Sequence, residues 1–168
     1  VGVLTFHKAI NYGAVLQAYA LRMAVEGLGK SCSVVNYAGE KMEKESRILY
    51  FPKHNSKVDW LLYRYRLPMR ARTVRKFNRF LNAHLHLSHG RVIGEADLAH
   101  MKGDWEAFIT GSDQVFNYEG TGEDFNYYLE FVKCPVKRIA YAPSFGLSEI
   151  DENHTSRVKE ALKRFDAL

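Results

Sequence analysis

The chain has 168 residues, of which 46% are hydrophobic and 26% charged, and this composition is ordinary for one globular domain with a sizeable core. Its two cysteines are too few for a disulfide framework or a cysteine-rich metal cluster, so we expect a reduced, cytoplasmic protein. Neither an apolar run of about 18 residues nor a cleavable leader is visible, so we expect no membrane span and no secretion signal in these residues.

The first 28 residues predict a strand, a loop and a helix. Residues 1–4 form a short apolar run typical of a buried parallel strand, and residues 14–28 are apolar or small at nearly every position, as in a helix packed on a sheet. Residues 6–13 between them would lie at the carboxyl end of the strand, where a helix N-terminus suits an anion or a polar ligand. Asn11 is predicted to cap the helix, and Gly13 allows the backbone to approach a ligand closely.

The next segment completes a β-α-β unit and then leaves the sheet. Residues 31–37 have strand character, whereas residues 38–57 are polar and without clear period, so we interpret the latter as a long excursion. Two helices are expected over residues 60–67 and 73–85, and the second is amphipathic at helical spacing. Pro68 predicts a break between them, because proline disfavours helical backbone in the residue before it.

The stretch from Lys57 to Arg79 is strongly basic, with eight Lys or Arg residues and Asp59 as its one acid. Trp60, Tyr63 and Tyr65 are interleaved with these charges. We favour a solvated helix face, because charge runs on helices usually face water. The alternative is contact with an anionic surface, in which case a peripheral membrane contact is preferred over nucleic acid.

The second half of the chain predicts a further α/β succession. We expect a short helix over residues 95–101, a central strand over 105–110, a mobile Gly-rich loop over 119–126 and a strand over 138–142. A last helix follows, and two residues are candidates for its N-cap: Ser148 and Asp151. The histidines between His84 and His100 have no spacing typical of a zinc site, so we expect no metal.

Two polar loops each follow a predicted strand directly. Residues 111–117 replace an apolar run with small and polar side chains in one step, and residues 143–146 follow the next strand. In a parallel sheet both loops would lie at the same edge as residues 6–13. Asp113 is suited to act as a general base or to orient a sugar hydroxyl, although it and Asn117 can equally hold turn backbone through their side chains.

Three blocks of the sequence resemble the polysaccharide pyruvyl transferase family. The blocks are TFHKAINYGAVLQAYAL at residues 5–21, FITGSDQVFN at 108–117 and RIAYAPSFG at 138–146, in the family's order. Two positions depart from the family pattern: Phe116 stands where Trp is common, and Tyr118 stands where Pro often follows Asn117. Either departure can alter the acceptor pocket.

The resemblance implies transfer of a pyruvyl group from phosphoenolpyruvate to two hydroxyls of a glycan sugar, which gives a cyclic ketal and free phosphate. The setting would be bacterial envelope or exopolysaccharide synthesis, with a glycan or lipid-linked sugar as acceptor and no cofactor besides the donor substrate. The family's fold is similar to two-domain glycosyltransferases of the GT-B type, in which two Rossmann-like halves face a cleft. Residues 1–168 would be the N-terminal Rossmann-like domain, an α/β three-layer unit with a mostly parallel sheet.

The chain starts inside one predicted strand and stops where another is predicted to begin, so we interpret it as a piece of a longer protein. The resemblance also implies roles for particular residues. The donor site and the principal catalytic His and Arg residues are expected in the C-terminal half, and this piece alone is expected to be inactive. Asp113 and His7 are the catalytic candidates here, although a lone His after a strand is more often a hydrogen-bonded loop residue. The expected substrate-binding residues are Asn11, Tyr12, Gly13, Gln17, Ser112, Gln114, Asn117, Ser144, Phe145 and Gly146.

Two rival functions remain at this point. A glycosyltransferase of the same architecture would use a nucleotide-sugar donor. A non-catalytic module that binds an anionic surface would rest on the stretch from Lys57 to Arg79, at the inner face of the membrane. The strand-end loops favour an enzyme over such a module.

Overall fold

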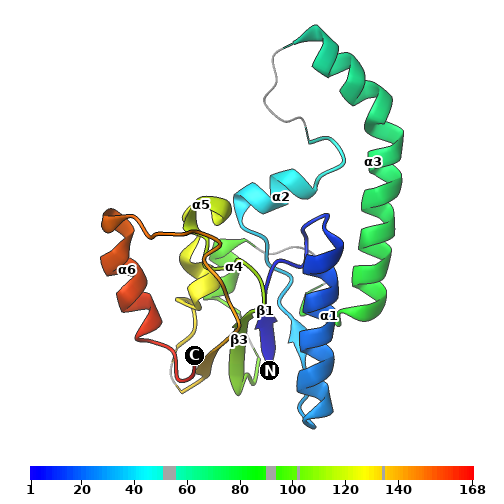
Figure 1. Cartoon of the computed structure of the whole chain (residues 1–168). Helices are drawn as coiled ribbons and strands as arrows, with labels where there is room; N and C mark the ends of the chain where they lie inside the picture. The colour runs from blue at the N-terminus through cyan, green and yellow to red at the C-terminus, as the bar shows by residue number, and fades with distance from the viewer. Residues whose placement is uncertain (51–55, 90–93, 102, 134) are drawn as a thin grey trace.

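A computed structural model describes residues 1–50, 56–89, 94–101, 103–133 and 135–168. Its centre is a four-stranded sheet in the order β2-β1-β3-β4, in which every neighbouring pair is parallel (Figure 1). The strands are β1 (Gly2–Leu4), β2 (Ser33–Val34), β3 (Ala107–Gly111) and β4 (Lys137–Tyr141). The predicted α/β, Rossmann-like three-layer fold is therefore confirmed.

Helices cover both faces of this sheet (Figure 1). One layer contains α1 (Tyr12–Gly27) and the C-terminal half of α3 (Lys57–His84). The other layer contains α4 (Glu95–Ala99), α5 (Tyr118–Thr121), the 3-10 helix η1 (Phe125–Tyr128) and α6 (Glu152–Leu162). The helix α2 (Glu40–Ser46) follows β2 beyond the carboxyl ends of the strands.

The central strand β1 contributes to both cores because its side chains alternate between the two faces of the sheet. Val3 packs in the core with α1 and α3, whereas Leu4 packs in the core with the other helices, and both are fully buried. Gly2 pairs with Phe108 of β3, and a Cβ atom at this position would overlap the Phe108 ring. The close packing of β1 on β3 therefore requires glycine there.

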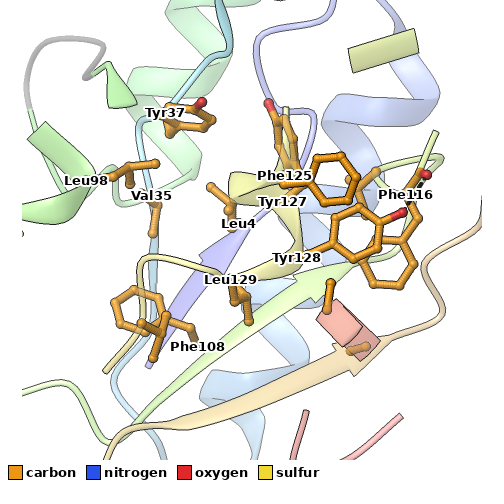
Figure 2. Packing of buried hydrophobic residues seen from close by; sticks show 14 of the residues in the cluster. Leu4, Val35, Tyr37, Leu98, Phe108, Phe116, Phe125, Tyr127, Tyr128 and Leu129 are labelled. Carbon is orange, nitrogen blue, oxygen red and sulfur yellow. Dashed lines mark hydrogen bonds between the residues drawn. The ribbon is translucent and has the colours of Figure 1, made fainter. Parts of the chain in front are cut away.

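Aromatic side chains dominate the core beside β3 and β4 (Figure 2). The rings of Phe116 and Tyr128 stack at 4.2 Å with an angle of 9° between their planes, and Tyr128 also stacks on Phe125. The Tyr128 hydroxyl donates a hydrogen bond of 2.9 Å to the Phe116 carbonyl. This bond ties η1 to the loop after β3.

Two predicted helix caps are confirmed. The side chain of Asn11 accepts hydrogen bonds from the backbone of Gly13 and Ala14 at the start of α1. Asp151, rather than Ser148, caps α6 by accepting from the backbone of Asn153. Both caps satisfy backbone N–H groups that the first helical turn leaves unpaired.

The predicted break at Pro68 is wrong, because α3 runs through it as one helix of 28 residues. Pro68 lies on an exposed part of the helix, where water can solvate the carbonyl group that loses its partner. Val74, Phe77 and Leu81 anchor the C-terminal half of α3 in the core. Helix propensity and this anchorage together outweigh the local cost of the proline.

Two segments predicted to lack regular structure contain short helices. Residues 40–46 form α2, which carries exposed ion pairs from Lys44 to Glu40 and from Arg47 to Glu43. The segment predicted as a mobile loop contains α5 and the start of η1, which are capped by Asn117 and Asp124. These caps are side-chain interactions that a search for apolar periodicity does not detect.

Cys32 is buried and unpaired, and burial raises its pKa to about 11, so its thiol stays protonated at neutral pH. Cys134 lies outside the described residues. Among the residues that the structure describes, no helix combines the length and the apolarity needed to cross a bilayer.

Candidate functional site

Three loops meet at the carboxyl edge of the sheet, as the parallel order predicts. β1, β3 and β4 are consecutive parallel neighbours, so residues 6–13, 112–117 and 142–146 leave the sheet at the same edge. Two backbone hydrogen bonds join the second and third loops. Ser144 N donates to the Asp113 carbonyl at 2.9 Å, and Phe116 N donates to the Ser144 carbonyl at 3.2 Å. These loops therefore form one hydrogen-bonded unit.

Two glycines allow this close approach. Gly111 has φ +121°, and a Cβ atom there would overlap the carbonyl oxygen of Tyr141 on β4. Gly146 has φ +62°, and a Cβ atom there would meet the side chain of Gln114 at 2.5 Å. Gln114 and Gly146, both predicted to bind substrate, are therefore in direct apposition.

Some polar side chains of the second loop accept hydrogen bonds from nearby backbone N–H groups. Asp113 Oδ1 accepts a hydrogen bond of 2.7 Å from Gln114 N, and Asn117 Oδ1 accepts one of 2.7 Å from Gly120 N. Among the described residues, the second carboxylate oxygen of Asp113 has no hydrogen-bond partner. Asp113 is half-buried, as is Ser112, whereas Ser144 is exposed. The turn interpretation thus accounts for Asn117, while Asp113 keeps one oxygen available to a ligand.

The first loop places its candidate residues on different sides. The Tyr12 ring lies 5.0 Å from the Phe77 ring of α3, so it is directed toward that helix. Gln17 reaches back from α1, and its Nε2 donates a hydrogen bond of 2.7 Å to Thr5 Oγ1. Among the described residues, the buried Oε1 of Gln17 has no partner. An unsatisfied acceptor therefore lies just below the carboxyl end of β1.

His7 is fully buried beneath the same loop. Its Nε2 lies 3.0 Å from the side-chain oxygen of Asn36, and its Nδ1 lies 3.3 Å from the Thr5 carbonyl. Burial is the main cause that lowers the pKa of His7 from 6.5 to about 4, so the imidazole is neutral at pH 7. This placement favours the interpretation of His7 as a hydrogen-bonded loop residue over direct proton transfer to a substrate.

Asn36 extends this network to the segment that follows α3. Its Nδ2 donates a hydrogen bond of 2.8 Å to the His89 carbonyl, and its backbone N donates one of 3.2 Å to Ser88 Oγ. Val34 also forms a parallel bridge with Leu87. The ends of β1 and β2 and the chain after α3 are thus held together by buried polar groups.

A polar cavity of about 670 Å³ lies between α2, η1 and α6, and the sequence predictions missed it. Tyr37, Asp124 and Asn126 form its hydrogen-bonded wall. The Tyr37 hydroxyl donates to Asp124 Oδ2 at 2.5 Å and accepts from Asn126 Nδ2 at 3.1 Å. Burial and the bond to Asp124 raise the pKa of Tyr37. A sequence signal did exist, because Asn36 and Tyr37 follow β2 as the other polar loops follow their strands.

A basic residue in the first loop was also missed. Lys8 follows His7 directly, and burial lowers the pKa of its ammonium group. Among the described residues, no group of three His, Cys, Asp or Glu side chains has an arrangement suited to a metal ion. The carboxyl edge therefore offers an amide, a carboxylate and one cation as groups for ligand recognition.

The two departures from the family pattern are both buried. Phe116 is part of the aromatic core, where its ring also lies 5.6 Å from the Phe145 ring. Tyr118 stacks on His154 at 4.1 Å, and its hydroxyl accepts a hydrogen bond from Asp151 N. Phe116 can therefore affect a bound ligand only through the packing of the loops around it, whereas Tyr118 also lines a small cavity together with His154.

Comparison with known proteins identifies the family. The family model described as "Polysaccharide pyruvyl transferase" matches residues 11–168. No curated protein and no solved structure matches the chain significantly. The matched region contains β2, β3, β4 and all of the second and third strand-end loops. The chain belongs to the polysaccharide pyruvyl transferase family.

Proposed function

We propose that the full-length protein transfers a pyruvyl group from phosphoenolpyruvate to two hydroxyls of a glycan sugar, and that this domain binds the sugar acceptor. The observation that carries the proposal is the hydrogen-bonded unit of residues 112–117 and 142–146, next to the loop after β1, in a chain of this family. Polar loops at the carboxyl edge of a parallel sheet are the usual ligand site of such folds.

The reaction sets the demands on the site. Protonation of the methylene carbon of phosphoenolpyruvate gives the adjacent carbon positive character, and a sugar hydroxyl attacks it. Phosphate then leaves, and a second hydroxyl closes the ketal ring as it loses its proton. Asp113 is proposed to accept a proton from, or to orient, an acceptor hydroxyl through its free carboxylate oxygen. His7 is proposed to hold the loop through Asn36 instead of exchanging protons.

Acceptor recognition is proposed to use polar groups around Asp113. The amide of the exposed Gln114 can donate a hydrogen bond to a sugar hydroxyl or accept one from it. Lys8 is suited to an anionic group of either substrate. The donor phosphate and carboxylate need more positive charge than these loops contain, so the main donor site is proposed to lie in the C-terminal half.

The test is an activity assay on the full-length protein with phosphoenolpyruvate and a panel of lipid-linked and nitrophenyl sugars. Phosphate release must be accompanied by a product that has gained the mass of a pyruvyl ketal. Asp113→Ala is expected to abolish both signals with little change in melting temperature. Asp104→Ala is the matched control, because Asp104 is exposed just before β3, at the opposite edge of the sheet.

A glycosyltransferase remains the rival activity. If no sugar supports phosphate release, and a nucleotide sugar but not phosphoenolpyruvate raises the melting temperature, the pyruvyl proposal fails. Normal activity in Asp113→Ala would be compatible with the proposed reaction, but it would show that Asp113 takes no part in catalysis.

A further inference from the structure

Helix α3 carries an exposed apolar stripe in its first half. Its five large side chains are between 45% and 83% exposed: Val58, Leu61, Leu62, Tyr65 and Met69. At 3.6 residues per turn these positions fall on one face of the helix. Among the described residues of α3, burial begins only at Val74, so the first half of the helix contributes nothing to the core.

The stripe lies largely opposite the side of α3 that contacts the rest of the chain, and its edge, at Leu62, Tyr65 and Met69, borders a cavity that Ile10 and Tyr50 also line. The opposite side of the helix contacts the segment after α2. Tyr63 Oη donates to the Ile48 carbonyl at 3.5 Å, and Arg70 donates to the carbonyls of Glu45 and Arg47 at 2.6 and 2.9 Å. Figure 1 shows the first half of α3 projecting beyond the carboxyl edge of the sheet. The stripe is therefore available to a partner outside this domain.

The same face continues as a basic surface. Arg72, Lys76 and Arg79 are exposed and follow the stripe at helical spacing. The whole helix holds eight Lys or Arg residues and one Asp. The net charge of the entire chain is only +5, so the rest of the chain is slightly acidic. The positive charge is thus concentrated on the element that exposes the apolar stripe.

We propose that α3 lies on the surface of an anionic phospholipid bilayer, with the apolar stripe among the upper acyl chains and Arg72, Lys76 and Arg79 at the head groups. An anionic bilayer provides an apolar layer directly below negative charge, which matches the two halves of this face. A second copy of the helix would bring two strongly basic surfaces together. α3 is not apolar enough to cross the bilayer, so it lies in the interface.

The test is sedimentation of the full-length protein with vesicles of phosphatidylcholine alone and with 30% phosphatidylglycerol added. Binding is expected to be at least tenfold tighter to the anionic vesicles and to weaken with added salt. Each basic residue near an anionic surface adds about fivefold, so the triple change Arg72→Gln, Lys76→Gln and Arg79→Gln should lower binding roughly 100-fold. The matched control removes the same charge elsewhere, as Lys133→Gln, Lys137→Gln and Lys159→Gln.

The apolar stripe has its own variant, Leu61→Ser with Tyr65→Ser, which is expected to lower the binding that persists at high salt roughly tenfold. Equal binding to both kinds of vesicle, or an equal loss in the control variant, overturns the proposal. Light scattering supplies a further check, because a dimer that this double variant dissociates would identify a second copy as the occupant. A lower melting temperature of the double variant without vesicles would instead show that another part of the full-length protein covers the stripe.

Discussion

The imidazole Nε2 of His7 lies 3.0 Å from the side-chain oxygen of Asn36, and both side chains are buried under the carboxyl edge of the sheet. Asn36 donates its Nδ2 to the His89 carbonyl, so its oxygen faces His7 and fixes the imidazole proton on Nε2. Burial keeps this imidazole neutral, although the hydrogen bonds to Asn36 and to the Thr5 carbonyl favour the charged form.

Stability should depend on pH through this histidine. Burial lowers the pKa of His7 to about 4, whereas the unfolded chain binds the same proton near pH 6.5. Between these values the unfolded state holds more protons, so stability is lost as the pH falls from 6.5 toward 4, by about 3 kcal/mol in full. Above pH 6.5 no effect is expected. His7→Gln should give a flatter profile of melting temperature in this window, and parallel profiles would show that His7 is not held neutral.

Gly111→Ala should destabilise the junction of β3 and β4. The backbone at Gly111 has φ +121°, and the added methyl group would overlap the Tyr141 carbonyl. We expect a loss of about 3 kcal/mol in urea unfolding. Gly27→Ala is the control, because nothing lies within 4 Å of a Cβ atom at the end of α1, and it should gain about 0.5 kcal/mol. Similar values for the two variants would contradict the packing at Gly111.

The ion pair between Arg22 and Glu26 should matter more than the pairs on the surface. Arg22 Nη1 lies 2.6 Å from Glu26 Oε1, and their side chains are 5% and 30% exposed. Glu26→Gln leaves a buried guanidinium short of its counter-charge, which should cost about 2 kcal/mol in urea unfolding. Glu40→Gln breaks the exposed pair with Lys44 and should have no measurable effect. An equally small effect of both changes would mean that solvent screens Arg22.

Pro68→Ala should strengthen the projecting half of α3. The proline lacks the N–H that would bond to the Arg64 carbonyl, and nothing in the core holds this part of the helix. Hydrogen exchange should show that residues 58–70 open less easily, by about 1 to 2 kcal/mol, with little change near Leu81. Unchanged exchange would indicate that the contacts of Arg70, and not helix propensity, limit opening of this half.

The sequence predicts the sheet and its edge because both depend on local patterns. Short apolar runs identify the strands, and the polar residues that follow β3 and β4 identify the loops that meet. The wall of the polar cavity escapes prediction because Tyr37 and Asp124 lie 87 residues apart in the chain. The burial of His7 escapes for the same reason, since it depends on Asn36 and on the segment after α3.

The continuity of α3 escapes prediction for a different reason. The backbone geometry of proline predicts the end of a helix at Pro68. The helix nevertheless continues, because Val74, Phe77 and Leu81 anchor its C-terminal half in the core. Helix α2 is missed because it has no buried residue and therefore no apolar stripe. Patterns of burial thus predict the elements that face the core, but they miss a short helix such as α2 that does not.

Because β1 lies between β2 and β3, its two sides find their partner strands at different times during synthesis. β1 pairs with β2 about 30 residues later, but its second neighbour, β3, pairs Phe108 with Gly2 across more than 100 residues. Until β3 leaves the ribosome, one side of β1 has unpaired backbone groups and Leu4 has no completed core around it. The nascent chain therefore presents an open strand edge from the synthesis of β1 until that of β3, and a chaperone that covers it would act before residue 108 emerges.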